Sequence, residues 1–369
     1  MHRRLLVLLI VVLLSVSSFA QFKDGFDKRE ALDMIAICNS FTFQKVFDDG
    51  EAILPESYTE IYESAAIGLD NKWQLLQNDE YAVINLRGST ASPMSWMANI
   101  YSAMIPANGS ITIEEGRTID YYLSDNPKAN VHAGWTLAMI FLSEEIVSKI
   151  KELNSDGVYH FIITGHSQGA AIATLLRTYL EHAPDSIVDK RNNFKTYAFA
   201  SPKPANEYYA RNYSNYFSSS SFIINNPNDP IINMPISKND KPIIDLEEVL
   251  QHVGDKDNTY LKFLAFRAIG QVLGGEDDSL LIKRTGQNMH KQMFRGNEEV
   301  EIPAYVADMS YCFPVKPKYI QSFSEANFIN KRYYNEFDMD SANMFYQHKP
   351  YLYFLEIQRE YFPDEFMKW

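Results

Sequence analysis

The stretch FIITGHSQGAAIATLLRTYL, from Phe161 to Leu180, constrains the fold more than any other part of the chain. An apolar, strand-like run stops at Gly-His-Ser-Gln-Gly, and an alanine-rich, helix-like run begins at once. Glycines on both sides of a serine let a strand and a helix approach closely, while the serine sits in strained backbone geometry with its hydroxyl exposed. The pattern predicts a nucleophile elbow, with Gly165 and Gly169 at the turn and Ser167 as the nucleophile. The alternative is an ordinary turn, and the strand and helix on either side favour the nucleophile.

Strand-like and helix-like segments alternate on both sides of this turn. YAVINL, VYHFIIT, KTYAFAS and SFIINN have the composition of buried strands. Apolar residues at helical spacing from Leu137 to Leu153, and the run after Ser167, indicate helices. This alternation predicts an α/β fold in which helices cover both faces of a mostly parallel sheet.

The two ends of this α/β region have different patterns. Between Asp24 and Asn78 we expect mostly helix, because ALDMIAICNSF and SYTEIYESAAIGL both carry apolar residues at helical spacing. WQLLQNDEYAVINL reads as two strands around an Asn-Asp turn. After Pro235 the alternation stops for about a hundred residues. We therefore expect one domain over residues 21–369, with a largely helical insertion at about 236–340.

The first twenty residues have the anatomy of a secretory signal peptide. A basic start, MHRR, precedes an apolar run from Leu5 to Val16, and small residues precede a cut between Ala20 and Gln21. The apolar run has 12 residues, whereas a spanning helix needs roughly 20. This length favours a cleaved signal over a membrane anchor and predicts an exported protein, periplasmic or secreted.

The charge and the cysteines exclude some functions. The formal net charge is -13, and loss of Arg3 and Arg4 with the signal would take it to -15. Such an acidic surface repels nucleic acid, which is therefore not an expected partner. Cys38 and Cys312 are the two cysteines, and they could pair in an exported protein or remain as two buried thiols. Neither their number nor their spacing suggests a metal site, and no cofactor is expected.

A serine nucleophile needs a base and an orienting acid, which follow it in the order Ser, Asp or Glu, His in this kind of fold. Asp229 comes directly after the apolar SFIINN segment, between two prolines, and is the expected acid. The alternative is an aspartate that only shapes a proline turn. His348 is the expected base, because a loop position before Pro350 suits a catalytic histidine. His252, in a helix-like stretch of the insertion, is the main competitor.

An oxyanion hole needs two main-chain N–H groups that point to the forming negative charge. One is expected from Gln168, directly after the nucleophile. The other is expected from Ser89 in LRGST, where Gly88 permits a tight turn after a strand. Taken alone, LRGST fits an ordinary turn equally well.

Several separated motifs stand in one order along the chain: LRGST, MSWMANIY, VHAGW, ITGHSQGA, YAFASPKPAN, NNPNDPIINMP and a late histidine followed by a tyrosine. From about Trp73 to Pro235 this order resembles the class 3 lipase family, the fungal triacylglycerol lipase type. The resemblance implies an α/β-hydrolase fold, and His132 in VHAGW would be structural. It matches the same site residues to family roles: nucleophile Ser167, acid Asp229, histidine His348, and oxyanion positions Ser89 and Gln168.

The segment ASPMSWMANIYSAMIPANG lies where this family carries its lid, and it is rich in methionine, aromatic and isoleucine side chains. One hypothesis is a lid that opens at a lipid surface and exposes these side chains. The other is a fixed helix that keeps them in the core. The sequence leaves both open.

These features together predict an exported serine hydrolase that cleaves carboxylic esters of lipids through an acyl-enzyme, as a triacylglycerol lipase or a related lipase. Its expected partners are the ester substrate and, transiently, a lipid interface. The alternatives are a phospholipase or acyltransferase of the same fold, or an inert lipid-binding surface protein. The long insertion, and Asn85-Leu86 where many family members have an aromatic residue, leave the substrate open. Chain length, head group and oligomeric state do not follow from the sequence.

Overall fold

A central sheet of seven strands organises the computed structural model, which describes residues 24–41, 54–90, 92–235, 237, 300–306, 310–321 and 346–366. The strand order is β1-β2-β3-β8-β9-β10-β11. The strands from β3 onward pair in parallel, whereas β1, β2 and β3 pair antiparallel. Their bounds are β1 Thr59–Glu63, β2 Trp73–Gln77, β3 Ala82–Leu86, β8 His160–His166, β9 Asn193–Phe199, β10 Ser221–Asn225 and β11 Lys318–Tyr319.

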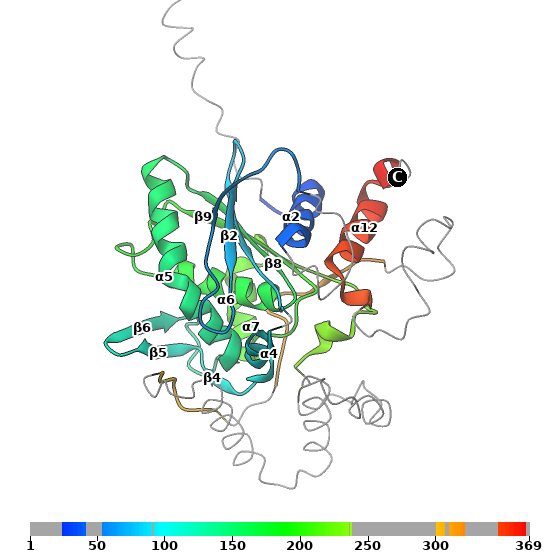
Figure 1. Ribbon diagram of the computed structural model, residues 1–369. Helices are drawn as coiled ribbons and strands as arrows, with labels where there is room; N and C mark the ends of the chain where they lie inside the picture. Colours follow the sequence, from blue (N-terminus) through cyan, green and yellow to red (C-terminus); the bar gives the residue numbers. More distant parts are fainter. Residues whose placement is uncertain are drawn as a thin grey trace, which may run out of the picture.

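Helices cover both faces of this sheet (Figure 1). One hydrophobic cluster joins the sheet to α5, α6 and α7, and a second joins the opposite face to α2 and α12. Successive strand residues point to opposite faces, so Ile84 belongs to the first cluster and Val83 to the second. The expected α/β-hydrolase-like architecture is confirmed. The helices are α2 Lys28–Phe41, α5 Ala133–Ser155, α6 Gln168–His182, α7 Glu207–Phe217 and α12 Pro350–Tyr361.

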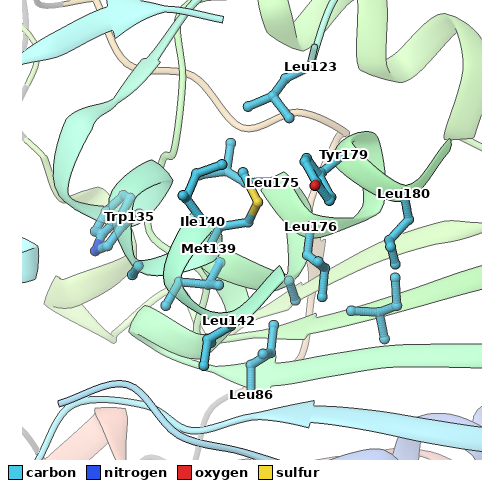
Figure 2. Close-up of a cluster of buried hydrophobic side chains, with 14 of the residues drawn as sticks. Leu86, Leu123, Trp135, Met139, Ile140, Leu142, Leu175, Leu176, Tyr179 and Leu180 are labelled. Carbon is cyan, nitrogen blue, oxygen red and sulfur yellow. The ribbon is translucent and has the colours of Figure 1, made fainter. Parts of the chain in front are cut away.

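The first cluster holds the helix that follows Ser167 in place. Figure 2 shows side chains of α5 and α6 packed against each other above the sheet, with Leu86 from the end of β3 beneath them. The apolar stripe predicted on α5 is buried, including Leu137, Ile140 and Ile146. Burial of a leucine or isoleucine side chain contributes about 1.5–3 kcal/mol, so this interface fixes α6 against the strand ends.

Shorter elements lie around the sheet. β5 and β6 form an antiparallel hairpin at one edge of the molecule (Figure 1). β4 and β7 form a second, smaller antiparallel pair. The bounds are α4 Pro93–Ile100, β4 Met104–Pro106, β5 Asn108–Glu114, β6 Arg117–Tyr122, β7 Asn130–His132, η1 Pro230–Asn233, η3 Tyr346–His348 and α13 Pro363–Phe366.

The prediction of helix for SYTEIYESAAIGL is wrong, since Thr59–Glu63 forms strand β1 and pairs with β2. Threonine, isoleucine and tyrosine favour strands, and the free edge of β2 supplies partners for the backbone N–H and C=O groups. β1 is an edge strand, and Ile61 is 45% exposed. The apolar side chains of β1 are therefore largely exposed and do not form the buried face of a helix. The predictions of helix for ALDMIAICNSF and of a turn at Asn78 are confirmed.

Part of the predicted insertion joins the main domain. Lys318–Tyr319 forms β11 beside β10. Glu301 forms a bridge to β5, Val306 one to β4 and Cys312 one to Ala205. Much of the remainder, including His252, lies outside the described residues, as does the predicted signal peptide. The helical insertion therefore stays a prediction. Cys38 and Cys312 do not form a disulfide, and no helix among the described residues could cross a membrane.

Candidate active site

Ser167 lies at the sharp turn between β8 and α6, because β8 ends at His166 and α6 begins at Gln168. Its backbone angles are φ 59° and ψ -126°, a conformation that is strained for a residue with a side chain. Hydrogen bonds from Ser167 N to Phe199 O, at 3.0 Å, and from Ala170 N to Ser167 O, at 3.0 Å, hold the turn. The surrounding main chain thus fixes the direction of the Ser167 hydroxyl.

Two glycines make this turn possible by removing side chains from a close backbone contact. A Cβ atom on Gly165 would lie 2.4 Å from the carbonyl carbon of Gly169. A Cβ atom on Gly169 would lie 2.1 Å from the carbonyl oxygen of Leu86, at the end of β3. Both distances are far below van der Waals contact, so the approach of α6 to the sheet requires glycine at both positions.

Ser167, His348 and Asp229 meet at the carboxyl ends of the parallel strands. His348 Nε2 lies 2.7 Å from Ser167 Oγ, and His348 Nδ1 lies 2.7 Å from Asp229 Oδ2. His348 is 3% exposed and Asp229 is fully buried. In this arrangement the imidazole can take the serine proton, and the carboxylate can stabilise the positive charge that results.

Asp229 follows β10 and begins the short turn η1. Its Oδ1 accepts a hydrogen bond from Ile231 N at 2.9 Å, and its Oδ2 accepts one from the Tyr353 hydroxyl at 2.8 Å. The residue therefore shapes the proline turn and faces His348 at the same time. The two readings of Asp229 from the sequence are compatible, because the two carboxylate oxygens have different partners.

Tyr353 is a member of the site that sequence reasoning missed. It lies on α12, directly after His348, and its hydroxyl accepts a hydrogen bond from Asn226 N at 2.9 Å. Burial, together with the neighbouring Asp229 carboxylate, raises the pKa of Tyr353 well above its usual range. The hydroxyl thus stays protonated and can donate to Asp229 at any working pH. Tyr351, the tyrosine that directly follows the His348-Lys349-Pro350 stretch, lies on the same helix, and it is Tyr353 that contacts Asp229.

His166 is a second buried imidazole next to the site. Its ring centroid lies 4.8 Å from that of His348. Burial lowers the pKa of His166 well below its usual range, and the proximity of His348 lowers it further. His166 therefore stays neutral and adds no positive charge beside His348. The sequence placed it next to the nucleophile but gave no sign that it would face the base.

Ser89 and Gln168, the residues expected to form the oxyanion hole, lie side by side. The Ser89 hydroxyl donates to Gln168 Oε1 at 3.0 Å. Gln168 is the first residue of α6, where a main-chain N–H has no acceptor within the helix. A Cβ atom on Gly88 would lie 2.9 Å from His166 O, so this turn packs directly against the end of β8. The arrangement can present two main-chain donors beside Ser167.

The segment considered as a lid is packed into the domain. Tyr101, Met104 and Ile105 are fully buried, and Met94 and Met97 pack against the first hydrophobic cluster. The fixed-helix hypothesis expects this packing of the five side chains in the core.

His132 has the structural role that the sequence predicted. It is the N-cap of α5, its Nδ1 accepts a hydrogen bond from Trp135 N at 3.3 Å, and its ring stacks on Trp135. Among the described residues, no group of three or more His, Cys, Asp and Glu side chains could hold a metal ion.

Residues 83–239 match the family model described as Lipase (class 3). The match confirms the resemblance predicted from the sequence.

Three solved structures are similar to part of this chain. The chain is similar to a Rhizomucor miehei lipase in complex with its propeptide, at 18% identity over 58% of this chain and 66% of that chain, with a TM-score of 0.41. It is similar to a mutant form of MDLA from Penicillium cyclopium, at 21% identity over 60% and 76%, with a TM-score of 0.40. A triacylglycerol lipase from Penicillium expansum has 15% identity over 57% and 75%, with a TM-score of 0.41.

Proposed function

We propose that this chain, whose residues 83–239 match the class 3 lipases, is an exported serine hydrolase that cleaves carboxylic esters of lipids. The observation that carries the proposal is the 2.7 Å separation of Ser167 Oγ and His348 Nε2, with Asp229 on the opposite ring nitrogen. A serine hydroxyl is a weak nucleophile until a base removes its proton. The three side chains meet this requirement although they come from distant parts of the chain.

The reaction proceeds in two halves. Ser167 Oγ attacks the ester carbonyl carbon while His348 Nε2 takes its proton, and the N–H groups of Ser89 and Gln168 bind the oxyanion. His348 then returns the proton to the leaving alcohol, which leaves the acyl group on Ser167. Water attacks this acyl-enzyme, His348 takes the proton of the water, and the free acid leaves as the proton returns to Ser167. Asp229 holds the imidazole in the required tautomer throughout.

Covalent labelling with a fluorophosphonate tests the assignment of the nucleophile. The folded protein is expected to take up one label on Ser167, located by peptide mass spectrometry, and Ser167→Ala is expected to take up none. Ser143→Ala is the matched control, because that hydroxyl is buried in α5 and bonded to Ile140 O. If the folded wild-type protein stays unlabelled, the inert lipid-binding alternative replaces the proposal. Phospholipid substrates and an added alcohol acceptor separate lipase from phospholipase and acyltransferase.

Export rests on the signal-peptide pattern of residues 1–20. Expressed with these residues in a cell that has a secretory pathway, the protein is expected outside the cytoplasm with Gln21 as its first residue. The measurement is the intact mass of the recovered chain. A chain that remains in the cytoplasm, or that keeps MHRR at its start, would contradict this part of the proposal.

A further inference from the structure

Four side chains from separate elements form a continuous series of hydrogen bonds behind the oxyanion residues. Trp135 Nε1, on α5, donates to Asn99 Oδ1 at 2.9 Å, and Asn99 Nδ2, on α4, donates to Ser89 Oγ at 2.8 Å. The Ser89 hydroxyl then donates to Gln168 Oε1 at 3.0 Å. We call this series the Trp135–Gln168 relay. It connects two helices, the turn after β3 and the start of α6.

We propose that Asn99 is a positioning residue for the oxyanion hole, and that α4 is a fixed part of this machinery. The inference rests on the proposed function, because it assigns a task to Asn99 only if Ser89 and Gln168 bind an oxyanion. Asn99 lies on α4 and touches Ser89, and it acts on the reaction through that contact.

The chemistry of the relay requires an amide at position 99. An indole N–H can only donate, so the Asn99 carbonyl oxygen must face Trp135 and the NH₂ group must face Ser89. Ser89 Oγ accepts that bond, which leaves its own hydrogen free to point at Gln168 Oε1. A carboxylate at position 99 could only accept. It would attract the Ser89 hydrogen and break the link to Gln168.

The hydrogen bond between Ser89 and Gln168 matters for catalysis because both residues are expected to supply main-chain N–H groups to the oxyanion. The side-chain bond between them fixes the separation of the two residues whose N–H groups are assigned to the oxyanion. Oxyanion donors act only when they are already in place, since their benefit depends on avoiding reorganisation during the reaction. Ser95, also on α4, adds a weaker bond to Gln168 Oε1 at 3.4 Å and accepts a bond from Thr90 N at 3.1 Å. Two α4 side chains therefore hold both sides of the predicted hole.

Independent contacts hold α4 in the position that the relay requires. Gly134 N donates to Tyr101 O at 3.0 Å, and a Cβ atom on Gly134 would lie 2.1 Å from Ala98 O. Two tyrosines from the later part of the chain add hydrogen bonds to the residues after α4. The Tyr305 hydroxyl bonds to the Tyr101 hydroxyl, and the Tyr311 hydroxyl donates to Ser102 O. An outward movement of α4 would break these contacts and the relay together. The position of α4 in this structure is therefore the one in which Asn99 can contact Ser89.

The test measures kcat and KM of Asn99→Asp and Asn99→Ala on a soluble short-chain nitrophenyl ester below its solubility limit. We expect kcat to fall roughly 10- to 100-fold, less than for loss of an oxyanion donor itself, while KM changes less than about threefold. Asn154→Ala is the matched control, because Asn154 bonds to Val158 O and Asn192 at the far end of α5. It is expected to lower the melting temperature and to leave kcat unchanged.

Trp135→Phe is the second variant, in case the Asn99 variants do not fold. It keeps an aromatic ring stacked on His132 and removes only the N–H donor, and a fall in kcat of about 3- to 10-fold is expected. Folded variants that keep wild-type kcat, or that change KM alone, would overturn the positioning role of Asn99. That result would leave the proposed function intact, whereas wild-type turnover by Ser167→Ala would remove the proposed function itself.

Discussion

Replacing His348 with alanine is expected to lower kcat by about 10⁴- to 10⁶-fold, with KM changed little. In the wild type, His348 Nε2 lies 2.7 Å from Ser167 Oγ, and His348 Nδ1 lies 2.7 Å from Asp229 Oδ2. Without a base the hydroxyl keeps its proton and cannot attack. Substrate binding should change little, because the substitution removes the base and leaves the main-chain N–H groups assigned to the oxyanion in place. The measurement is steady-state hydrolysis of a soluble ester.

The double variant gives the sharper test of the same claim. Groups that act as one unit lose their effect together, so Ser167→Ala combined with His348→Ala should be about as slow as either single variant. If the two losses multiplied instead, the residues would act independently and the proton transfer between them would be wrong. His182→Ala is the matched control, because this histidine lies in the last turn of α6 and bonds to Thr178 O. Its kcat is expected to equal that of the wild type.

The part of the site that the sequence predicts well is encoded locally. Ser167 and its two glycines are five consecutive residues with a strand before them and a helix after them, and this pattern determines the backbone geometry. Asp229 also follows from local information, since a polar residue directly after a parallel strand lies at the carboxyl edge of the sheet. The sequence order then reduces the choice of histidine to a few positions.

The residues that the sequence missed depend on how helices pack. Tyr353 rather than Tyr351 reaches Asp229, because Tyr353 lies on the face of α12 that packs against the sheet. Asn99 and Trp135 are 36 residues apart and meet only because α4 packs against the start of α5. No local pattern encodes such contacts.

The wrong prediction for β1 has a related cause. The helical spacing of apolar residues in SYTEIYESAAIGL is real, yet the segment lies beside the open edge of β2. Backbone hydrogen bonds between this segment and β2 determine its conformation. β2 begins ten residues after β1 ends, so a local pattern does not include it. An edge strand with few buried side chains has only a weak alternation of apolar and polar residues. Its apolar residues can then fall at helical spacing by chance.

Gly169→Ala is expected to destabilise the domain by about 3 kcal/mol or more and to remove the activity of any protein that still folds. The added methyl group would lie 2.1 Å from the Leu86 carbonyl oxygen. That oxygen is main chain at the end of β3, and no rotation of a side chain can move it away. Relief requires α6 to shift from the sheet, although its apolar face is packed tightly against α5.

Such a shift would also move the residues expected to bind the oxyanion, because α6 carries Gln168 and β3 leads into the turn with Ser89. The measurement is urea unfolding together with fluorophosphonate labelling. Gly116→Ala is the matched control: Gly116 has a φ of +73° and nothing within 4 Å of an added Cβ, so it should show only the backbone cost of about 1 kcal/mol. Equal stabilities of the two variants would mean that the β3–α6 approach can relax. The close contact would then not be what fixes the elbow, and the position of Ser167 would need another cause.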